Sequence, residues 1–288
     1  SPTAPPASLT LNLYYLNPSA ADGSDTSIFS FSDTFDPAPG TTFSNYVSFV
    51  QGAGGWLNGP HIIFRDKKTT IGLHGGIRMN GAVEQADLNA YLIQYDHSTN
   101  QWGPLHFIGA NDWPYNGESG PIIGRTPDGY WHAFIVSGYA NGARYYRTRN
   151  PDDFSSWDNR GLKFFAVDAA GRSAAECSYL HIDQNTGQMT FFTMISMPRT
   201  ELDRHFVYFT SHDSGNTWSA KTVVLDNIGL EPWLGRWRYR PEDNSLYFTW
   251  NTFNRTAIEH FDLYFARFSF NDHHLYAADG RDLGTIID

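Results

Sequence analysis

The sequence predicts an all-β fold, a β-propeller of four-stranded antiparallel blades that number about five. Aromatic residues make up 16% of the 288 residues and stand among 26 glycines and 15 prolines, a composition typical of short strands joined by turns. Units of four strands recur at roughly 55–60 residues, close to the length of a large propeller blade. No segment shows sustained helical periodicity. A β-sandwich is the structural alternative.

Four repeat units can be placed along the chain, each opening with a short strand and a polar turn. They start at His61, Gly120, Ser178 and near Trp233. We expect the first three to close with strands at 101–108, 162–167 and 221–225, and the last to lack a clear closing strand after 279–280. Earlier strand candidates at 9–17, 26–35 and 43–50 would supply a further blade or help to close the ring. Residues 1–288 are thus expected to form one domain, with a flexible segment at 1–8.

The stretch 211–218, Ser-His-Asp-Ser-Gly-Asn-Thr-Trp, joins two predicted strands. Asp213 can accept backbone hydrogen bonds within the turn, and Gly215 can adopt a positive φ. We expect Trp218 to hold the turn against its own sheet. The pattern S-x-D-x-G-x-T-W resembles the Asp-box of sialidases and related β-propellers; an ordinary hairpin turn is the alternative. The motif indicates architecture and says nothing about catalysis.

The charge of the chain excludes some partners. A formal net charge of −10 argues against nucleic acid and against an anionic membrane surface. A local basic pocket in an acidic protein can still hold an anionic sugar. Cys177 is the single cysteine, so we expect no intrachain disulfide and a small buried side chain. We expect no cofactor and no metal site, and a structural calcium ion is not indicated.

Two features favour a secreted glycoprotein, which we also expect to be a monomer. The first eight residues, Ser-Pro-Thr-Ala-Pro-Pro-Ala-Ser, look like the mature end left after removal of a signal peptide. Asn254 opens an Asn-Arg-Thr glycosylation sequon. Neither feature identifies a substrate.

Several stretches of the repeat carry a family resemblance. They are Gly-Pro-Ile-Ile at 120–123, Pro-Asp-Gly-Tyr at 127–130, Ser-Gly at 137–138, Tyr-Tyr-Arg-Thr at 145–148, Ser-Trp at 156–157, Ser-Tyr at 178–179, Phe-Phe at 191–192 and Asp-Leu-Tyr-Phe-Ala at 262–266. From about Trp56 onward the chain thus resembles the BNR-repeat propeller family that contains ulvan lyases and rhamnose–glucuronate lyases. Members of that family are usually longer and seven-bladed, so the resemblance implies a reduced form or a piece of one.

The resemblance also implies positions for catalytic residues. These lyases share a His before one blade, a second His after its long strand, a Tyr that begins the next blade and an Arg on that blade's second strand. The two His positions fall on Glu118 and Tyr139, and the Tyr position falls on Tyr179. The Arg position falls near 194–195, where this chain has none, and Arg199 follows closely.

β-Elimination at a uronate needs a group that neutralises the carboxylate, a base and an acid. Tyr179 is a candidate base or acid if a nearby cation lowers its pKa. His74 stands at the end of a long predicted strand beside a Gly pair, and His181 shares a strand face with Tyr179. Candidates to hold the carboxylate in a bidentate fork are Arg78, Arg147 and Arg199.

Two alternatives remain open. Hydrolysis needs two carboxylates, which Glu118 and Glu176 could supply from equivalent loop positions, with Asp112 and Glu231 as further candidates. Binding without catalysis is the other alternative, because aromatic rings in loops can stack on sugars. The candidate aromatic residues are Trp56, Trp113, Tyr115, Trp233 and Trp237.

The stretch 233–240 should alternate if it is extended. We expect an aromatic face and an arginine face, which would carry Trp233, Trp237 and Tyr239 on one side and Arg236, Arg238 and Arg240 on the other. The sequence as a whole favours a secreted propeller that binds an acidic plant or algal polysaccharide or oligosaccharide and cleaves it by β-elimination.

Overall fold

The computed structural model describes residues 61–75, 88–111, 121–136, 143–163, 174–196, 204–226, 231–254 and 259–287. The chain divides into two compact units, Ser1–Ser48 and Phe49–Asp288, and all described residues belong to the second. The strand candidates at 9–17, 26–35 and 43–50 lie outside the described residues. The further blade and the single domain therefore stay predictions.

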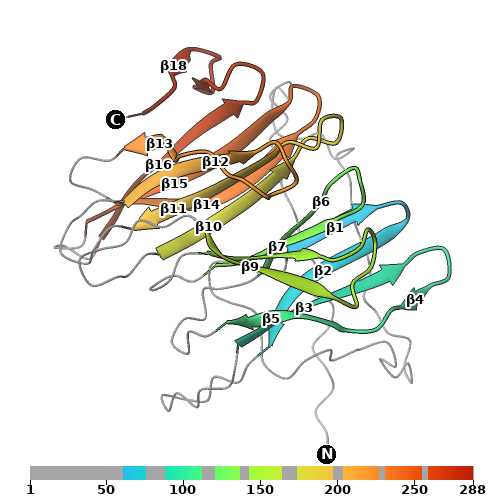
Figure 1. The fold of residues 1–288 in the computed structure, drawn as a ribbon. Coiled ribbons are helices and arrows are strands. Elements are labelled where there is room, and N and C mark those ends of the chain that lie inside the picture. The colour runs from blue at the N-terminus through green and yellow to red at the C-terminus, as the bar shows by residue number, and fades with distance from the viewer. Residues whose placement is uncertain are drawn as a thin grey trace, which may run out of the picture. The chain divides into compact units, whose positions relative to one another are not determined.

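The described residues form four antiparallel sheets that follow one another in chain order, from blue to red in Figure 1. They are the blades of a propeller arrangement, so the predicted all-β propeller fold is confirmed. The first strands of neighbouring blades lie side by side: β6 contacts β1 and β10, and β10 contacts β14. Within the described part of the chain, we find no helix that is long and apolar enough to cross a membrane.

Blade 1 comprises β1 (His61–Arg65), β2 (Lys68–Gly75), β3 (Leu88–Asp96), β4 (Gln101–Trp102) and β5 (His106–Asn111). The strand expected at 101–108 is divided in two. β4 pairs with β3 through Tyr95 and Trp102, and pairing resumes in β5 at His106. The interruption contains Pro104, which has no N–H to donate to a strand ladder.

Blades 2 and 3 each contain four strands in chain order. Blade 2 comprises β6 (Pro121–Arg125), β7 (Trp131–Val136), β8 (Ala143–Thr148) and β9 (Trp157–Lys163). Blade 3 comprises β10 (Ala174–Ile182), β11 (Met189–Ser196), β12 (Arg204–Ser211) and β13 (Thr222–Asp226). The fourth strand of blade 2 begins at Trp157, ahead of the position that we predicted from the apolar run at 162–167.

Blade 4 comprises β14 (Glu231–Arg240), β15 (Ser245–Asn254), β16 (Glu259–Ser269), β17 (Leu275–Tyr276) and β18 (Asp282–Gly284). The expectation of no closing strand was wrong, because β17 and β18 pair beyond β16. Both are too short to show alternation in the sequence. The chain then returns to blade 3, where Ile287 forms a parallel bridge with Leu225.

Each blade has two distinct ends, which follow from its antiparallel register. We call one the loop end: there the first strand begins, the second ends, the third begins and the fourth ends, as Pro121, Val136, Ala143 and Lys163 do in blade 2. The opposite end, where the first and second strands are joined by a tight turn, is the turn end. In blade 1 this turn places Asp66 and Lys67 at positive φ.

Three apolar clusters hold neighbouring blades together. One joins blades 1 and 2 through residues such as Leu92 and Trp131. The second joins blades 2 and 3, where Phe134 stacks on Phe191 with ring centroids 4.3 Å apart. The third joins blades 3 and 4 and also includes Cys177, which is buried as expected. Because each blade buries its faces against its neighbours, the sheets stabilise one another.

The stretch 211–218 forms the expected turn. Asp213 accepts a hydrogen bond from the Thr217 backbone N–H at 2.9 Å, and the Ser211 hydroxyl accepts one from the Gly215 N–H at 2.9 Å. Gly215 has a φ of 79°, as predicted. The expectation for Trp218 needs correction: its ring packs edge-on against Phe134 and Tyr145, which belong to blade 2 rather than to its own sheet. The turn therefore ties two blades together.

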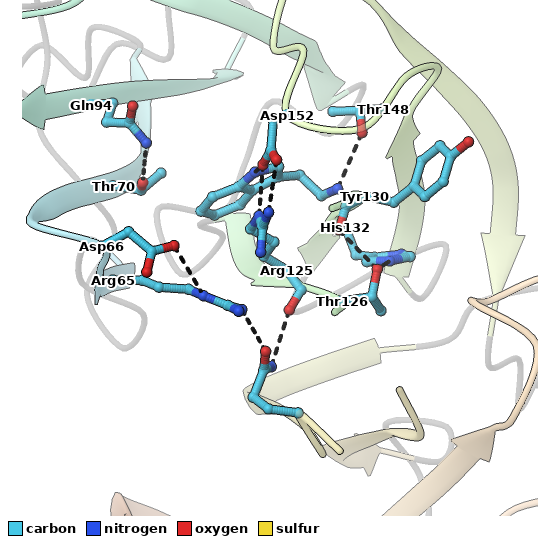
Figure 2. A network of polar contacts seen from close by, with 12 residues as sticks. Arg65, Asp66, Thr70, Gln94, Arg125, Thr126, Tyr130, His132, Thr148 and Asp152 are labelled. Carbon is cyan, nitrogen blue, oxygen red and sulfur yellow. Dashed lines mark hydrogen bonds and ion pairs between the residues drawn. The ribbon is translucent and has the colours of Figure 1, made fainter. Parts of the chain in front are cut away.

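A polar network links three blades at their turn ends (Figure 2). Arg125 of blade 2 donates two hydrogen bonds to Asp152, at 2.6 and 2.7 Å, and this contact raises the pKa of the guanidinium and lowers that of the carboxyl group. Gln184, after β10, donates to the Arg125 carbonyl at 3.1 Å and accepts from Arg65 of blade 1. The turn ends are thus fixed by polar contacts as well as by packing.

Replacement of Gly215 by Ala should lower the free energy of unfolding by roughly 2–4 kcal/mol. A Cβ at this position would overlap the Tyr145 hydroxyl, and the positive φ adds backbone strain. Gly161→Ala is the matched control, because Gly161 has a φ of 80° but nothing lies within 4 Å of its added Cβ. It should cost only about 1 kcal/mol. Urea denaturation measures both values, and equal losses would contradict the close approach between blades.

Candidate functional site

The loop end is the candidate functional site, because most of the sequence-predicted residues map to it. Eight of them lie outside the described residues. They are Trp56, Arg78, Asp112, Trp113, Tyr115, Glu118, Tyr139 and Arg199. Six of these eight are within three residues in sequence of a described strand terminus at the loop end. Their place at this end of the blades stays a prediction.

Three further candidates have a described backbone at the loop end. His74 is the next-to-last residue of β2 and pairs with Ala90. Glu176 is opposite Met194 near the start of β10, just before a register shift at which Cys177 has a φ of 47°. Asn254 is the last residue of β15. His74 thus lies on the second strand of blade 1 and Glu176 on the first strand of blade 3, both close to the loop end.

Tyr179 lies deeper in blade 3, opposite Phe192. Its half-buried ring stacks on Trp237 of blade 4 with centroids 6.2 Å apart. Burial raises the pKa of the Tyr179 hydroxyl, with a further rise from Tyr239 and a smaller opposing effect of Arg238. The condition that a cation lowers this pKa is therefore not met. A hydroxyl that stays protonated can donate a proton but cannot act as a base at neutral pH.

Two predicted residues lie at the turn end, away from the others. The His181 ring is buried between Phe270 and Tyr239, with centroid distances of 4.0 and 4.4 Å. It shares with Tyr179 a face that packs on blade 4, as the strand period predicts. Arg147 lies over the ring of Tyr130 at 3.9 Å and donates to the Ser214 carbonyl at 3.4 Å. These contacts bridge blades, and the structure does not bring either residue to the loop end.

Strand β14 carries the predicted alternation over its described side chains. Trp237 and Tyr239 are half-buried in the cluster with blade 3, while Arg238 and Arg240 are exposed. A register shift between Leu234 and Arg236 interrupts the strand. Trp233, on the loop-end side of this shift, packs edge-on against Phe253 at 5.7 Å. Its ring therefore contacts the neighbouring strand and is half-buried.

The sequence analysis missed one His–carboxylate pair at the loop end. His205 and Asp226 face each other across β12 and β13, and their Nδ1 and Oδ1 atoms are 2.9 Å apart. The hairpin pairing of the two strands is the signal that could have found them. Both lie on the third and fourth strands of blade 3, so they sit further from the first strands than His74 or Glu176 does. In the described part of the chain, no group of His, Cys, Asp and Glu is arranged to hold a metal ion.

Comparison with known proteins rests on structure alone, since no protein-family model and no curated protein sequence matches the chain. An ulvan lyase of family PL25, solved bound to a saccharide of glucuronate and 3-sulfated rhamnose, superposes with a TM-score of 0.58. The two share 15% sequence identity over 82% of this chain and 59% of the lyase. The polysaccharide lyase Uly1 gives a TM-score of 0.52 at 10% identity over 79% of this chain and 56% of that lyase.

The similarity shows the fold. The chain spans less than two thirds of the length of these lyases. The expected likeness to ulvan lyases is thus found at the level of structure, whereas membership of the BNR-repeat family stays a prediction.

Buried imidazoles give this fold a testable acid sensitivity. Burial lowers the pKa of His61 and His181 to about 4 and that of His132 to about 3. The neutral His132 ring lies 2.7 Å from the Tyr145 hydroxyl and 3.2 Å from that of Thr126, so it can accept from one and donate to the other. Each ring is neutral in the folded protein but protonates near pH 6.5 once unfolded.

The free energy of unfolding should therefore be insensitive to these groups above pH 6.5 and should fall as the pH drops from 6.5 towards 4. Each histidine contributes a slope of up to about 1.4 kcal/mol per pH unit, because the unfolded state binds a proton that the folded state excludes. His181→Phe keeps the stacking on Phe270 and should reduce the slope by the contribution of one histidine, up to about 1.4 kcal/mol per pH unit. Denaturation at several pH values measures this, and an unchanged slope would contradict the burial of a neutral His181.

Proposed function

We propose that this chain is a carbohydrate-active propeller that cleaves a uronate-containing plant or algal polysaccharide by β-elimination. The observation that carries the proposal is the fold shared with an ulvan lyase over 82% of the chain. The position of the candidate residues supports it. Catalytic residues are often carried by loops on a rigid scaffold. His74 and Glu176 have their backbones at the loop end, and we expect Glu118 and Tyr139 in the segments before β6 and after β7.

The chemistry can be assigned to residues that match its three requirements. A cation beside the uronate carboxylate acidifies the proton on the adjacent carbon, a role for Arg78 or Arg199 in the segments after β2 and β11. His74 takes that proton as the base. The electron pair then forms a carbon–carbon double bond, the bond to the glycosidic oxygen breaks, and an acid protonates the leaving oxygen.

Of the two roles, Tyr179 can act as the acid but not as the base. Its raised pKa keeps the hydroxyl protonated, which is the form that donates. Among the described residues, the hydroxyl has no hydrogen-bond partner, so no protein acceptor competes there for its proton. This assignment leaves the base to another residue, and we propose His74 because imidazole is the side chain that most often serves as a general base.

The substrate class sets where the protein would act. A plant or algal polysaccharide is met outside the cell, and a secreted glycoprotein is consistent with the sequon at Asn254. The last residue of β15 carries this sequon at the loop end. We further propose that the protein acts as a monomer on an acidic chain that lies across the loop ends of several blades.

Incubation with a glucuronate-containing polysaccharide should generate the ultraviolet absorbance of an unsaturated uronate. Tyr179→Phe should reduce the rate by roughly 10²–10⁴-fold while the fold is retained, because the proton donor is lost. Tyr239→Phe is the matched control: this tyrosine also packs against the cluster between blades 3 and 4 and has a raised pKa, but its hydroxyl bonds Asn244 at the turn end. Full activity of Tyr179→Phe would remove Tyr179 from the reaction.

Two further outcomes would contradict elimination. New reducing ends without the absorbance would indicate hydrolysis, for which Glu118 and Glu176 are the candidates. Retention on the polysaccharide without either signal would indicate a lectin.

A separate comparison of two histidines tests the base. His74→Ala should lower the elimination rate by roughly 10²–10⁴-fold. His205→Ala removes an imidazole from the same end of a blade but from its third strand, and it should leave most of the activity. Rates are measured by the same absorbance after circular dichroism has shown that both variants are folded. A larger loss of rate in His205→Ala than in His74→Ala would assign the role of the base to the His205–Asp226 pair.

A further inference from the structure

A cavity of about 280 Å³ lies at the turn end of blade 1, where the fourth strand is interrupted between β4 and β5. We call it the blade 1 pocket. Its lining combines ring faces with amide and carboxylate groups and includes Gln94, Asp96, Gln101, Trp102, His106 and Phe154. None of these residues belongs to the candidate site at the loop end.

The pocket is a product of the local fold. Pro104 interrupts the ladder, and the Gly103 N–H donates to the Gln94 carbonyl at 2.8 Å, which holds the chain beside β3. The far wall comes from blade 2, whose β8–β9 connection brings Phe154 against His106 with ring centroids 5.5 Å apart. The cavity thus sits where two blades meet, and its walls are held by separate sheets.

Trp102 gives the pocket a ring that a ligand can reach. Trp102 is 38% exposed, and its ring contacts that of Tyr95 on the neighbouring strand, with centroids 4.9 Å apart. Supported, partly exposed indole rings bind the C–H faces of sugar rings, whereas amide and carboxylate groups at the edge bind their hydroxyl groups. Gln94, Gln101 and Asp96 supply such groups in the lining.

The charges of the lining select among sugars. Backbone N–H groups of Ser98 and Thr99 lower the pKa of Asp96, and burial lowers that of His106, so at neutral pH the pocket holds a carboxylate and a neutral imidazole. The residues that line the cavity include no Lys or Arg, and Lys68, whose Nζ lies 3.9 Å from Oδ2 of Asp96, is outside the lining. A uronate would therefore meet a like charge, while a neutral sugar would meet a strong hydrogen-bond acceptor.

We propose that the blade 1 pocket binds one neutral sugar ring of a glycan, as an accessory site apart from the loop end. Its volume is near the lower bound of ligand pockets, about 300 Å³, which suits one ring rather than an oligosaccharide. Such a site would hold a neutral part of a polysaccharide while the loop ends act elsewhere on it. The binding itself does not depend on the proposed reaction, because it needs no catalytic residue.

The test uses the whole protein labelled with 5-fluorotryptophan. The Trp102→Phe variant identifies the fluorine resonance of Trp102, and the otherwise unaltered labelled protein is then titrated with xylose, rhamnose, glucose and glucuronate. At least one neutral sugar should shift that resonance with a millimolar Kd, a typical affinity for one small ring in an open pocket. Glucuronate should bind at least about tenfold more weakly because of Asp96.

Two variants control the titration. Gln101→Ala removes an exposed amide of the lining. It should raise the Kd of the neutral sugar several-fold without unfolding the protein. Phe107→Ala removes an aromatic ring that is 53% exposed on β5 but outside the lining, and it should leave the Kd unchanged. The proposal is overturned if no neutral sugar shifts the Trp102 resonance, if glucuronate binds equally well, or if Gln101→Ala has no effect. Since no cleavage is measured, failure of the lyase proposal would leave this result intact.

Discussion

The structure depends on close packing between neighbouring sheets, which requires the backbone of one blade to approach the side chains of the next. Gly109 faces the ring of Tyr146, Gly124 faces Leu180, and Gly215 faces Tyr145, each across a blade boundary. A Cβ at any of the three would lie closer to these side chains than real contacts allow. The aromatic clusters between blades can form only because these positions carry no side chain.

This packing divides each blade into a structural half and a half that can vary. At the turn ends, Gln184 bonds both Arg65 and the Arg125 carbonyl, and Ser214 in the turn around Asp213 donates to Asp128, so that neighbouring sheets are joined there. Residues there are already committed to contacts between blades, as Arg147 and His181 show. At the loop ends, the strands terminate and the segments that follow can differ in length without disturbing the clusters. Chemistry is therefore expected at the loop ends.

Much of the fold could be predicted from the sequence because it is determined by residues that are close together in the chain. The four unit starts, the positive φ of Gly215 and the burial of Cys177 each depend on residues close in the chain. The division of the strand at Pro104, the two-residue strand β17 and the direction of Trp218 could not be predicted in the same way. The division at Pro104 depends on one missing hydrogen bond, and β17 is too short to show the two-residue period of a strand. The direction of Trp218 depends on a neighbouring blade that the local sequence does not specify.

The same limit explains why the candidate site could be placed but its roles could not be assigned from the sequence. The pattern located Tyr179 at the start of a blade, but its pKa is determined by Trp237 and the rest of the cluster, some sixty residues away in the chain. Burial there opposes ionisation more strongly than Arg238 favours it. A tyrosine in this setting stays protonated at neutral pH, so it is a weak acid and is not available as a base. A reaction at the loop ends that employs Tyr179 must therefore find its base elsewhere, and among the candidates in blade 1 His74, near the end of β2, is the residue whose side chain is suited to proton transfer.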